Sequence, residues 1–258
     1  MQYLIDRLRD SDELESALLQ PNNSGDTPFL AGASRGNRKA CECLLRAADG
    51  APTPTTGATM LRTANGAGDT PLKVAVASSQ GEDGEDTVAF LLKADDGIPR
   101  DPFGRSGTAA GDDPMSRTCV DRENGSGLSP LIVACERNLP AVADLLLQHG
   151  ADVDVRDPKG RNPLAIAAFC GCNDALQFLL DRASTTALLL NRRDGGGCTP
   201  VWLAARTGNL SVVELLMDAG ADATIKDDAG LSPHDVAAKF KKEKVEQYFA
   251  KRTESQSC

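Results

Sequence analysis

Residues 199–223 read TPVWLAARTGNLSVVELLMDAGADA, and this stretch decides the fold. It holds two short apolar segments: the first begins after a Thr-Pro pair, and the second ends at Gly220. Thr is a favourable helix N-cap because its hydroxyl accepts a hydrogen bond from the first turn, and Pro at the next position loses no helical hydrogen bond. Glycine beyond the last turn can take the left-handed conformation that ends a helix. The stretch therefore predicts two helices joined by a turn, each too short to be stable alone.

The same start signal occurs six times along the chain. A residue with a side-chain oxygen precedes a proline at Thr27, Thr70, Ser129, Asn162, Thr199 and Ser232. Two residues before each of these caps stands a glycine: Gly25, Gly68, Gly127, Gly160, Gly197 and Gly230. Five residues before each cap stands an Asn or Asp: Asn22, Asn65, Asn124, Asp157, Asp194 and Asp227. Glycine permits positive φ, and Asn and Asp favour tight turns. We therefore expect a finger-like turn before every first helix, with repeats starting near residues 22, 65, 124, 157, 194 and 227.

The repeat period points to a known family. Successive caps are 43, 59, 33, 37 and 33 residues apart. A period of 33 residues, with the segments SPLIVACERN, TPVWLAARTGNLSVVELLMDAGADA and SPHDVA, resembles the ankyrin repeat over residues 22 to about 250. The resemblance implies an all-α ankyrin-repeat solenoid, in which helix-turn-helix units with β-hairpin-like fingers stack on one another. The His that the family usually carries three residues after the cap is replaced at every copy, which puts its hydrogen bonds in doubt: Leu30, Lys73, Ile132, Ala165, Trp202 and Asp235 stand there.

The spacing also divides the chain into segments. We expect an N-terminal helical cap over residues 1–21, the repeat domain over 22–252 and a disordered tail over 253–258. Long insertions fall at 46–64 and 95–123, where Gly, Pro and Asp are frequent. Such composition favours mobile excursions that bury no apolar area. Whether the 95–123 insertion has a function or is a plain loop stays open at this point.

Composition limits the kind of partner. The 258 residues carry a net charge of −9, and an acidic chain repels phosphate backbones, so we expect no nucleic-acid binding. Its apolar runs are far shorter than the roughly 18 residues that a membrane-spanning helix needs. The first twenty residues are charged throughout, which is not typical of a secretory signal. The eight cysteines are sparse and irregularly spaced, as expected for reduced thiols in a cytoplasmic and/or nuclear protein.

Residues for catalysis or metal binding are scarce. The chain has two histidines, His149 and His234, and the repeat supplies no partners for a triad. The pairs Cys41/Cys43 and Cys170/Cys172 have C-x-C spacing, whereas zinc sites use C-x₂-C. We therefore expect no enzyme activity, no cofactor and no metal.

The family resemblance implies a function. Ankyrin repeats overwhelmingly mediate contacts between proteins, so we expect a non-enzymatic interaction module, an adaptor or scaffold, that binds a partner on its concave face of fingers and first helices. The alternative is a regulatory or assembly-chaperone subunit of a larger enzymatic complex, such as a ubiquitin ligase or proteasome. The chain is expected to be a monomer.

The residues of that face follow from the positions that vary in the family, which lie just before the cap and seven or eight residues after it. We call them, together with the residue that replaces the motif His in the fifth copy, the candidate surface: Glu136, Arg137, Lys159, Arg161, Phe169, Arg193, Trp202 and Arg206. This set is basic and aromatic apart from its one Glu, so the expected partner has an acidic and partly apolar surface. Trp and Arg are also frequent among interface hot spots. In the alternative interpretation, Trp202 packs inside its own repeat and Phe169 fills the gap to the next one.

Overall fold

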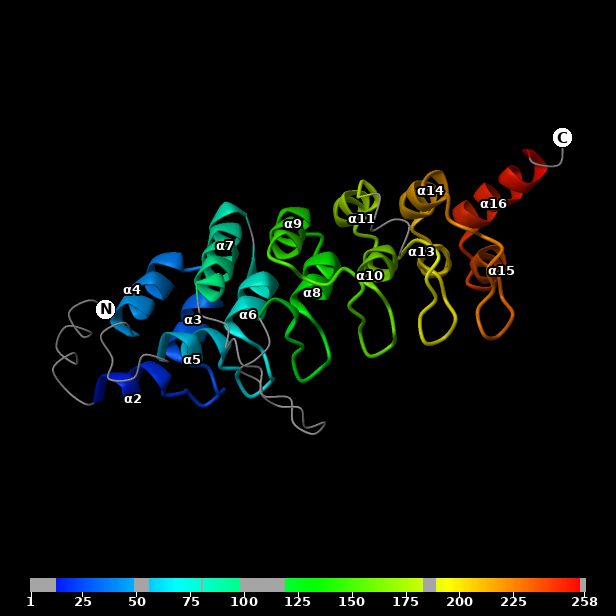
Figure 1. The fold of residues 1–258 in the computed structure, drawn as a ribbon. Helices are drawn as coiled ribbons and strands as arrows, with labels where there is room; N and C mark the ends of the chain where they lie inside the picture. The colour runs from blue at the N-terminus through cyan, green and yellow to red at the C-terminus, as the bar shows by residue number, and fades with distance from the viewer. Residues whose placement is uncertain (1–12, 49–55, 80, 98–118, 183–188, 256–258) are drawn as a thin grey trace, which may run out of the picture. The chain divides into compact units, whose positions relative to one another are not determined.

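The computed structural model describes residues 13–48, 56–79, 81–97, 119–182 and 189–255 (Figure 1). Within these ranges the chain forms helices and turns and contains no strand. It divides into two compact units: unit 1 is Met1–Pro130 with Leu145–Ala151, and unit 2 is Leu131–Asp144 with Asp152–Cys258. The predicted all-α repeat architecture is confirmed.

Unit 1 contains the first two repeats and the finger of the third. Its helices are α2 (Glu13–Leu19), α3 (Pro28–Ala33), α4 (Arg38–Ala48), α5 (Thr56–Arg62), α6 (Pro71–Ser78), α7 (Glu82–Asp96) and the 3-10 helix η1 (Cys119–Asp121). The two helices of each repeat pack together as α3 with α4 and α6 with α7, and the first helices α3 and α6 also contact each other. Leu14 and Leu18 of α2 are buried where that helix contacts α3, α4 and α5.

Unit 2 contains the fourth, fifth and sixth repeats. Its helices are α10 (Pro163–Cys170), α11 (Asn173–Leu180), α13 (Pro200–Thr207), α14 (Leu210–Asp218), α15 (Pro233–Lys239) and α16 (Glu243–Ser255). The third repeat's helices are α8 (Pro130–Glu136) and α9 (Pro140–Gln148), and α9 contributes residues to both units. The first helices α10, α13 and α15 form a row, with the second helices on one side and the fingers projecting from the other (Figure 1).

The predicted caps begin the first helices. The side chains of Thr27, Thr70, Asn162, Thr199 and Ser232 each accept a hydrogen bond from the backbone N–H three residues later. At the sixth repeat the cap is reciprocal, because the Asp235 carboxylate accepts from the backbone N–H of Ser232. Short local signals thus determine where these helices start.

All six fingers are closed by the same local hydrogen bonds. The Asn or Asp that opens each finger accepts, through Oδ1, from the backbone N–H groups two and four residues later. Its own N–H donates to the carbonyl of the residue four positions on. Gly68 has φ +78°, and a Cβ there would lie 2.5 Å from the backbone nitrogen of Gly125 in the next finger. Glycine is therefore required both by the left-handed turn and by the close approach of neighbouring fingers.

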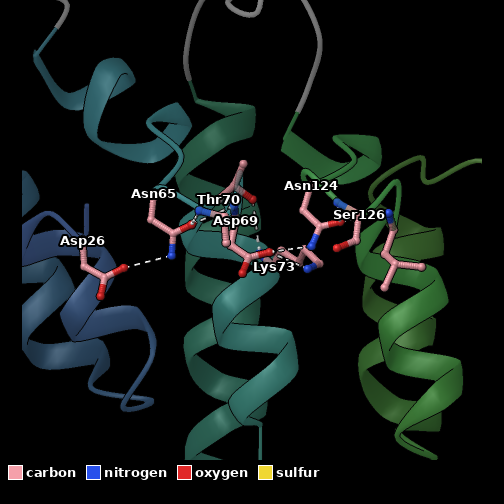
Figure 2. Close-up of polar contacts among 9 residues, drawn as sticks. Asp26, Asn65, Asp69, Thr70, Lys73, Asn124 and Ser126 are labelled. Carbon is pink, nitrogen blue, oxygen red and sulfur yellow. Dashed lines mark hydrogen bonds and ion pairs between the residues drawn. The ribbon is translucent and has the colours of Figure 1, made fainter. Parts of the chain in front are cut away.

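In unit 1 the fingers are also joined by side chains (Figure 2). The amide of Asn65 donates through Nδ2 to Asp26 Oδ1 of the preceding finger at 2.9 Å. The amide of Asn124 donates in the same way to Asp69 Oδ1, also at 2.9 Å. The Asp69 oxygen accepts a second bond from Lys73 Nζ, which is why this lysine can be only 6% exposed.

The expectation that the 46–64 insertion buries no apolar area is wrong. Residues 56–62 form α5, whose Met60 and Leu61 are buried and which contacts α4 and α7. Composition averaged over the insertion hid these two adjacent apolar residues, and both are buried because several helices pack around α5. At the end of the second insertion, Cys119 and Val120 are buried in η1, and the backbone N–H of Cys119 donates to Asp95. The expected excursion over 98–118 lies outside the described residues.

The chain's end also differs from the expectation. The last helix, α16, continues to Ser255, so the first residues of the segment expected to be disordered are helical. Its buried Val245 and Phe249 lie four residues apart, on one side of the helix, and the Phe249 ring packs against His234 of α15 in the same repeat. Residues 256–258 lie outside the described residues.

Candidate functional site

The eight residues of the candidate surface all lie in unit 2, on the fingers and first helices of repeats three to five. Five have exposed side chains: Glu136, Arg137, Lys159, Arg193 and Arg206. Two are half-buried, Arg161 and Phe169, and Trp202 is buried. Solvent therefore reaches most of the charged side chains of this surface but little of its two aromatic side chains.

Trp202 is 5% exposed, so its side chain is buried, as it would be in the alternative interpretation that it packs inside its own repeat. Its indole Nε1–H donates to the backbone carbonyl of Leu231 in the next finger, at 3.1 Å. The tryptophan therefore makes a hydrogen bond between neighbouring repeats from the position of the missing motif His. This bond also fixes the orientation of the ring.

Arg206 lies between that ring and a second one. Its Cζ atom is 5.9 Å from the centroid of the Trp202 ring and 5.4 Å from the centroid of the Phe240 ring, which comes from the following repeat. Both distances are within the range of cation–π contacts. No hydrogen bond or ion pair joins Arg206 to any other residue that the structure describes.

Phe240 was not among the residues selected from the sequence. At 43% exposure it is the one exposed large hydrophobic side chain in the described part of the chain. Its position could have found it, because it stands eight residues after its cap, as Arg137 does. We add Phe240 to the candidate surface.

Two arginines of the candidate surface, Arg161 and Arg193, lie on the fingers and bind neighbouring carboxylates. Arg161 donates to Asp157 Oδ2 from Nε at 2.8 Å and from Nη2 at 2.6 Å, while its Cζ lies 5.0 Å from the ring centroid of Phe169. Arg193 donates to Asp228 at 2.7 Å. These cations are partly neutralised within the protein, whereas Arg206 is not.

Three cysteine thiols near the candidate surface have raised pKa values. Burial, with the nearby charge of Glu136, raises the pKa of Cys170. Burial likewise raises the pKa of Cys172 to about 11, and its thiol donates to the Glu136 carbonyl. Burial and the carboxylates Asp194 and Asp227 raise the pKa of Cys198 to about 12. A thiol with a raised pKa is protonated at neutral pH and is a poor nucleophile.

Metal and membrane features are absent from the described residues. No group of three or more His, Cys, Asp or Glu in these ranges could hold a metal ion. No helix described is long and apolar enough to cross a membrane. The imidazole of His149 contacts Asp96 Oδ2 at 2.6 Å, and the His234 ring packs edge-on to Phe249.

Within each unit, the stacked helix pairs and their projecting fingers define a helical repeat protein. Family models described as ankyrin repeats match residues 110–187, as three copies, and residues 196–228. The crystal structure of EF0377, an ankyrin repeat protein, superimposes with a TM-score of 0.64 at 21% identity, covering 89% of this chain and 98% of that one. Residues 110–187 and 196–228 therefore match ankyrin repeats, and the fold is that of an ankyrin-repeat solenoid. Ankyrin repeats are generally protein–protein interaction modules.

Curated relatives are similar over part of their length. Human NF-kappa-B inhibitor alpha is 34% identical over 107 residues, which are 41% of this chain and 34% of that protein. The tyrosine-protein kinase HTK16 of Hydra vulgaris is 28% identical over 137 residues, which are 53% of this chain and 18% of the kinase. The chain thus spans about a third or less of the length of these relatives.

Proposed function

We propose that this protein is a non-enzymatic adaptor or scaffold that binds a partner protein through the candidate surface of unit 2. In this proposal the partner presents an acidic and partly apolar surface, and the protein acts as a monomer in the cytoplasm and/or nucleus. Trp202 supports the binding residues from beneath, since it is buried.

The observation that carries the proposal is the charge of this surface. The chain as a whole has a net charge of −9, yet the candidate surface holds five arginine and lysine side chains against one glutamate. These side chains are near one another: Glu136 and Arg161 both act electrostatically on the thiol of Cys170, and the finger of Lys159 hydrogen-bonds to the next finger at Gly195. A cationic face steers an acidic partner toward it.

The experiment compares two charge reversals of equal size. Arg137→Glu with Lys159→Glu changes the candidate surface, while Lys93→Glu with Lys244→Glu changes exposed lysines on second helices. The full chain and both variants are used to capture partners from a native lysate, with quantitative mass spectrometry as the readout. Circular dichroism melting checks that both variants are folded.

We expect the surface variant to capture at least one partner about tenfold less than the parent protein does, which is equivalent to about 1.4 kcal/mol of binding free energy. The control variant should retain that partner. If the surface variant keeps every partner of the parent protein, binding occurs elsewhere and the proposal is wrong. Equal loss in both variants would also overturn it, because net charge alone would then explain the capture.

A further inference from the structure

The guanidinium of Arg206 is held in place from two repeats. On one side is Trp202, which lies one helical turn earlier on α13 and is itself fixed by its bond to Leu231. On the other side is Phe240, which ends α15 and whose N–H donates to Val236. Because the Trp202 ring is fixed and Phe240 lies on the other side, the arginine loses less freedom when it binds a ligand than a side chain without such contacts.

The donors of this guanidinium are free. Arginine carries five N–H groups in a planar fork, and a cation–π contact with a ring does not consume them. In the described part of the chain no carboxylate pairs with Arg206, although Asp194 and Asp227 lie in the adjacent fingers. Each of these two aspartates uses Oδ1 to accept two backbone N–H bonds of its own finger.

Phe240, the ring on the outer side of Arg206, has two lysines beside it in sequence. Lys239 and Lys241 flank Phe240 and are exposed. An exposed aromatic ring next to an unpaired guanidinium offers apolar contact and charge to the same ligand. A planar guanidinium matches a carboxylate in shape, because two parallel N–H···O bonds can form at once.

We propose that Arg206 and Phe240 form a receptor for an acidic segment of the partner protein. One Asp or Glu carboxylate of that segment binds the Arg206 guanidinium, and a neighbouring apolar side chain covers Phe240. This inference rests on the proposed function and names the anchor of that surface. Arg161, which also lies on a ring, does not serve in this way because Asp157 already occupies its donors.

Synthetic peptides test the receptor. The probe is a fluorescein-labelled peptide of about twelve residues that alternates Glu and Phe with Ser spacers. A second peptide has Gln for every Glu, a third has Ser for every Phe, and a fourth has phosphotyrosine for the central Glu-Phe pair. Binding to the full chain is measured by fluorescence anisotropy, and the side-chain Nε–Hε resonance of Arg206 is followed by NMR.

We expect the Glu-Phe peptide to bind at least about tenfold more tightly than the Gln or the Ser peptide. Arg206→Gln and Phe240→Ala should each weaken its binding about tenfold, and Arg206→Lys nearly as much because the fork is lost. Arg35→Gln, which removes an exposed arginine from unit 1, is the matched control and should leave binding unchanged. The Arg206 resonance should shift with the Glu-Phe peptide.

The outcomes separate this inference from the proposed function. Equal binding of the Glu and Gln peptides, or unchanged binding to Arg206→Gln, overturns the receptor. Absence of binding by the Glu-Phe peptide, or tighter binding of the phosphotyrosine peptide, overturns it as well. If Arg206→Gln keeps a captured partner that Arg137→Glu with Lys159→Glu loses, the receptor is wrong while the interaction surface stands.

Discussion

The fingers of the first three repeats and those of the last three use different residues for the same turn. Asn22, Asn65 and Asn124 open the first three, whereas Asp157, Asp194 and Asp227 open the last three. In all six the Oδ1 atom accepts the same two backbone N–H bonds. The two groups differ only in the second side-chain atom, which is a donor in one group and an acceptor in the other.

The neighbouring repeat explains the choice. The fingers before Asn65 and Asn124 carry Asp26 and Asp69, and the amide nitrogens donate to these carboxylates. The fingers before the three aspartates carry Leu128, Arg161 and Cys198 at the same position. An aspartate facing Asp26 or Asp69 would place two like charges in contact. The residue that opens a finger is thus selected by the preceding repeat as well as by its own turn.

Asn65→Asp is the largest disruption of this pattern. It replaces the donor to Asp26 by a second carboxylate. We therefore expect the free energy of unfolding of unit 1 to fall by about 2–3 kcal/mol. Hydrogen exchange at the amides of Val74 and Val76 of α6 measures the loss. Acidification should reduce it, because protonating one of the two carboxylates removes the repulsion. A change below about 0.5 kcal/mol would show that the amide contributes little to unit 1.

Asp157→Asn makes the opposite change in unit 2. Oδ1 keeps its two backbone bonds, but the new amide nitrogen faces the N–H groups of Arg161, donor against donor. We expect the free energy of unfolding of unit 2 to fall by about 1–2 kcal/mol. Urea unfolding followed by the fluorescence of Trp202, the chain's one tryptophan, measures unit 2. A stabilising effect would mean that an amide suits both groups of fingers.

Asn124→Asp tests whether a nearby cation can replace the amide's donor. Lys73 already donates to Asp69, so the added carboxylate has a positive charge beside it. We expect the free energy of unfolding of unit 1 to fall by only about 1 kcal/mol, as measured by hydrogen exchange in α6. In a Lys73→Met background the same change should cost as much as Asn65→Asp. Equal costs with and without the lysine would rule out this compensation.

Lys241→Gly is the smallest change and leaves the fingers alone. Lys241 has φ +55° in the turn between the helices of the sixth repeat, where the fourth and fifth repeats have Gly171 and Gly208. Removing the strain of a left-handed lysine should stabilise unit 2 by about 0.5–1 kcal/mol, less the added freedom of glycine when unfolded. The same Trp202 fluorescence measurement applies. A loss of stability would show that the lysine side chain packs usefully against its repeat.

Most of the fold could be predicted, because its signals are local. A capping oxygen followed by proline, a glycine with positive φ and an Asn or Asp at the turn act within five residues, and the structure shows these features at the expected positions. The helix α5 could not be predicted in this way. Met60 and Leu61 form no repeat signal, and their burial depends on packing against neighbouring helices, among them α7 of the second repeat.

The candidate surface was predicted in part. Arg206 was selected from its position in the repeat, but its two rings and its free donors became visible only in the folded protein. Phe240 lies in the sixth repeat, from which the candidate surface took no residue. Arg161 and Arg193 are equivalent to Arg206 in charge, and only the structure shows that Asp157 and Asp228 bind them.

The sequence by itself determined the repeat, the starts of the first helices and the internal hydrogen bonds of each finger. These depend on neighbours within one turn of chain, so their chemistry can be read directly from the order of residues. The tertiary structure decided which group each remaining polar atom meets: Asn65 meets Asp26 across 39 residues, and Trp202 meets Leu231 across 29. Such pairs form only when repeats stack, because stacking sets the distance between fingers that the chain separates. The same stacking pairs Arg193 with Asp228 of the next finger and places Arg206 between the rings of Trp202 and Phe240.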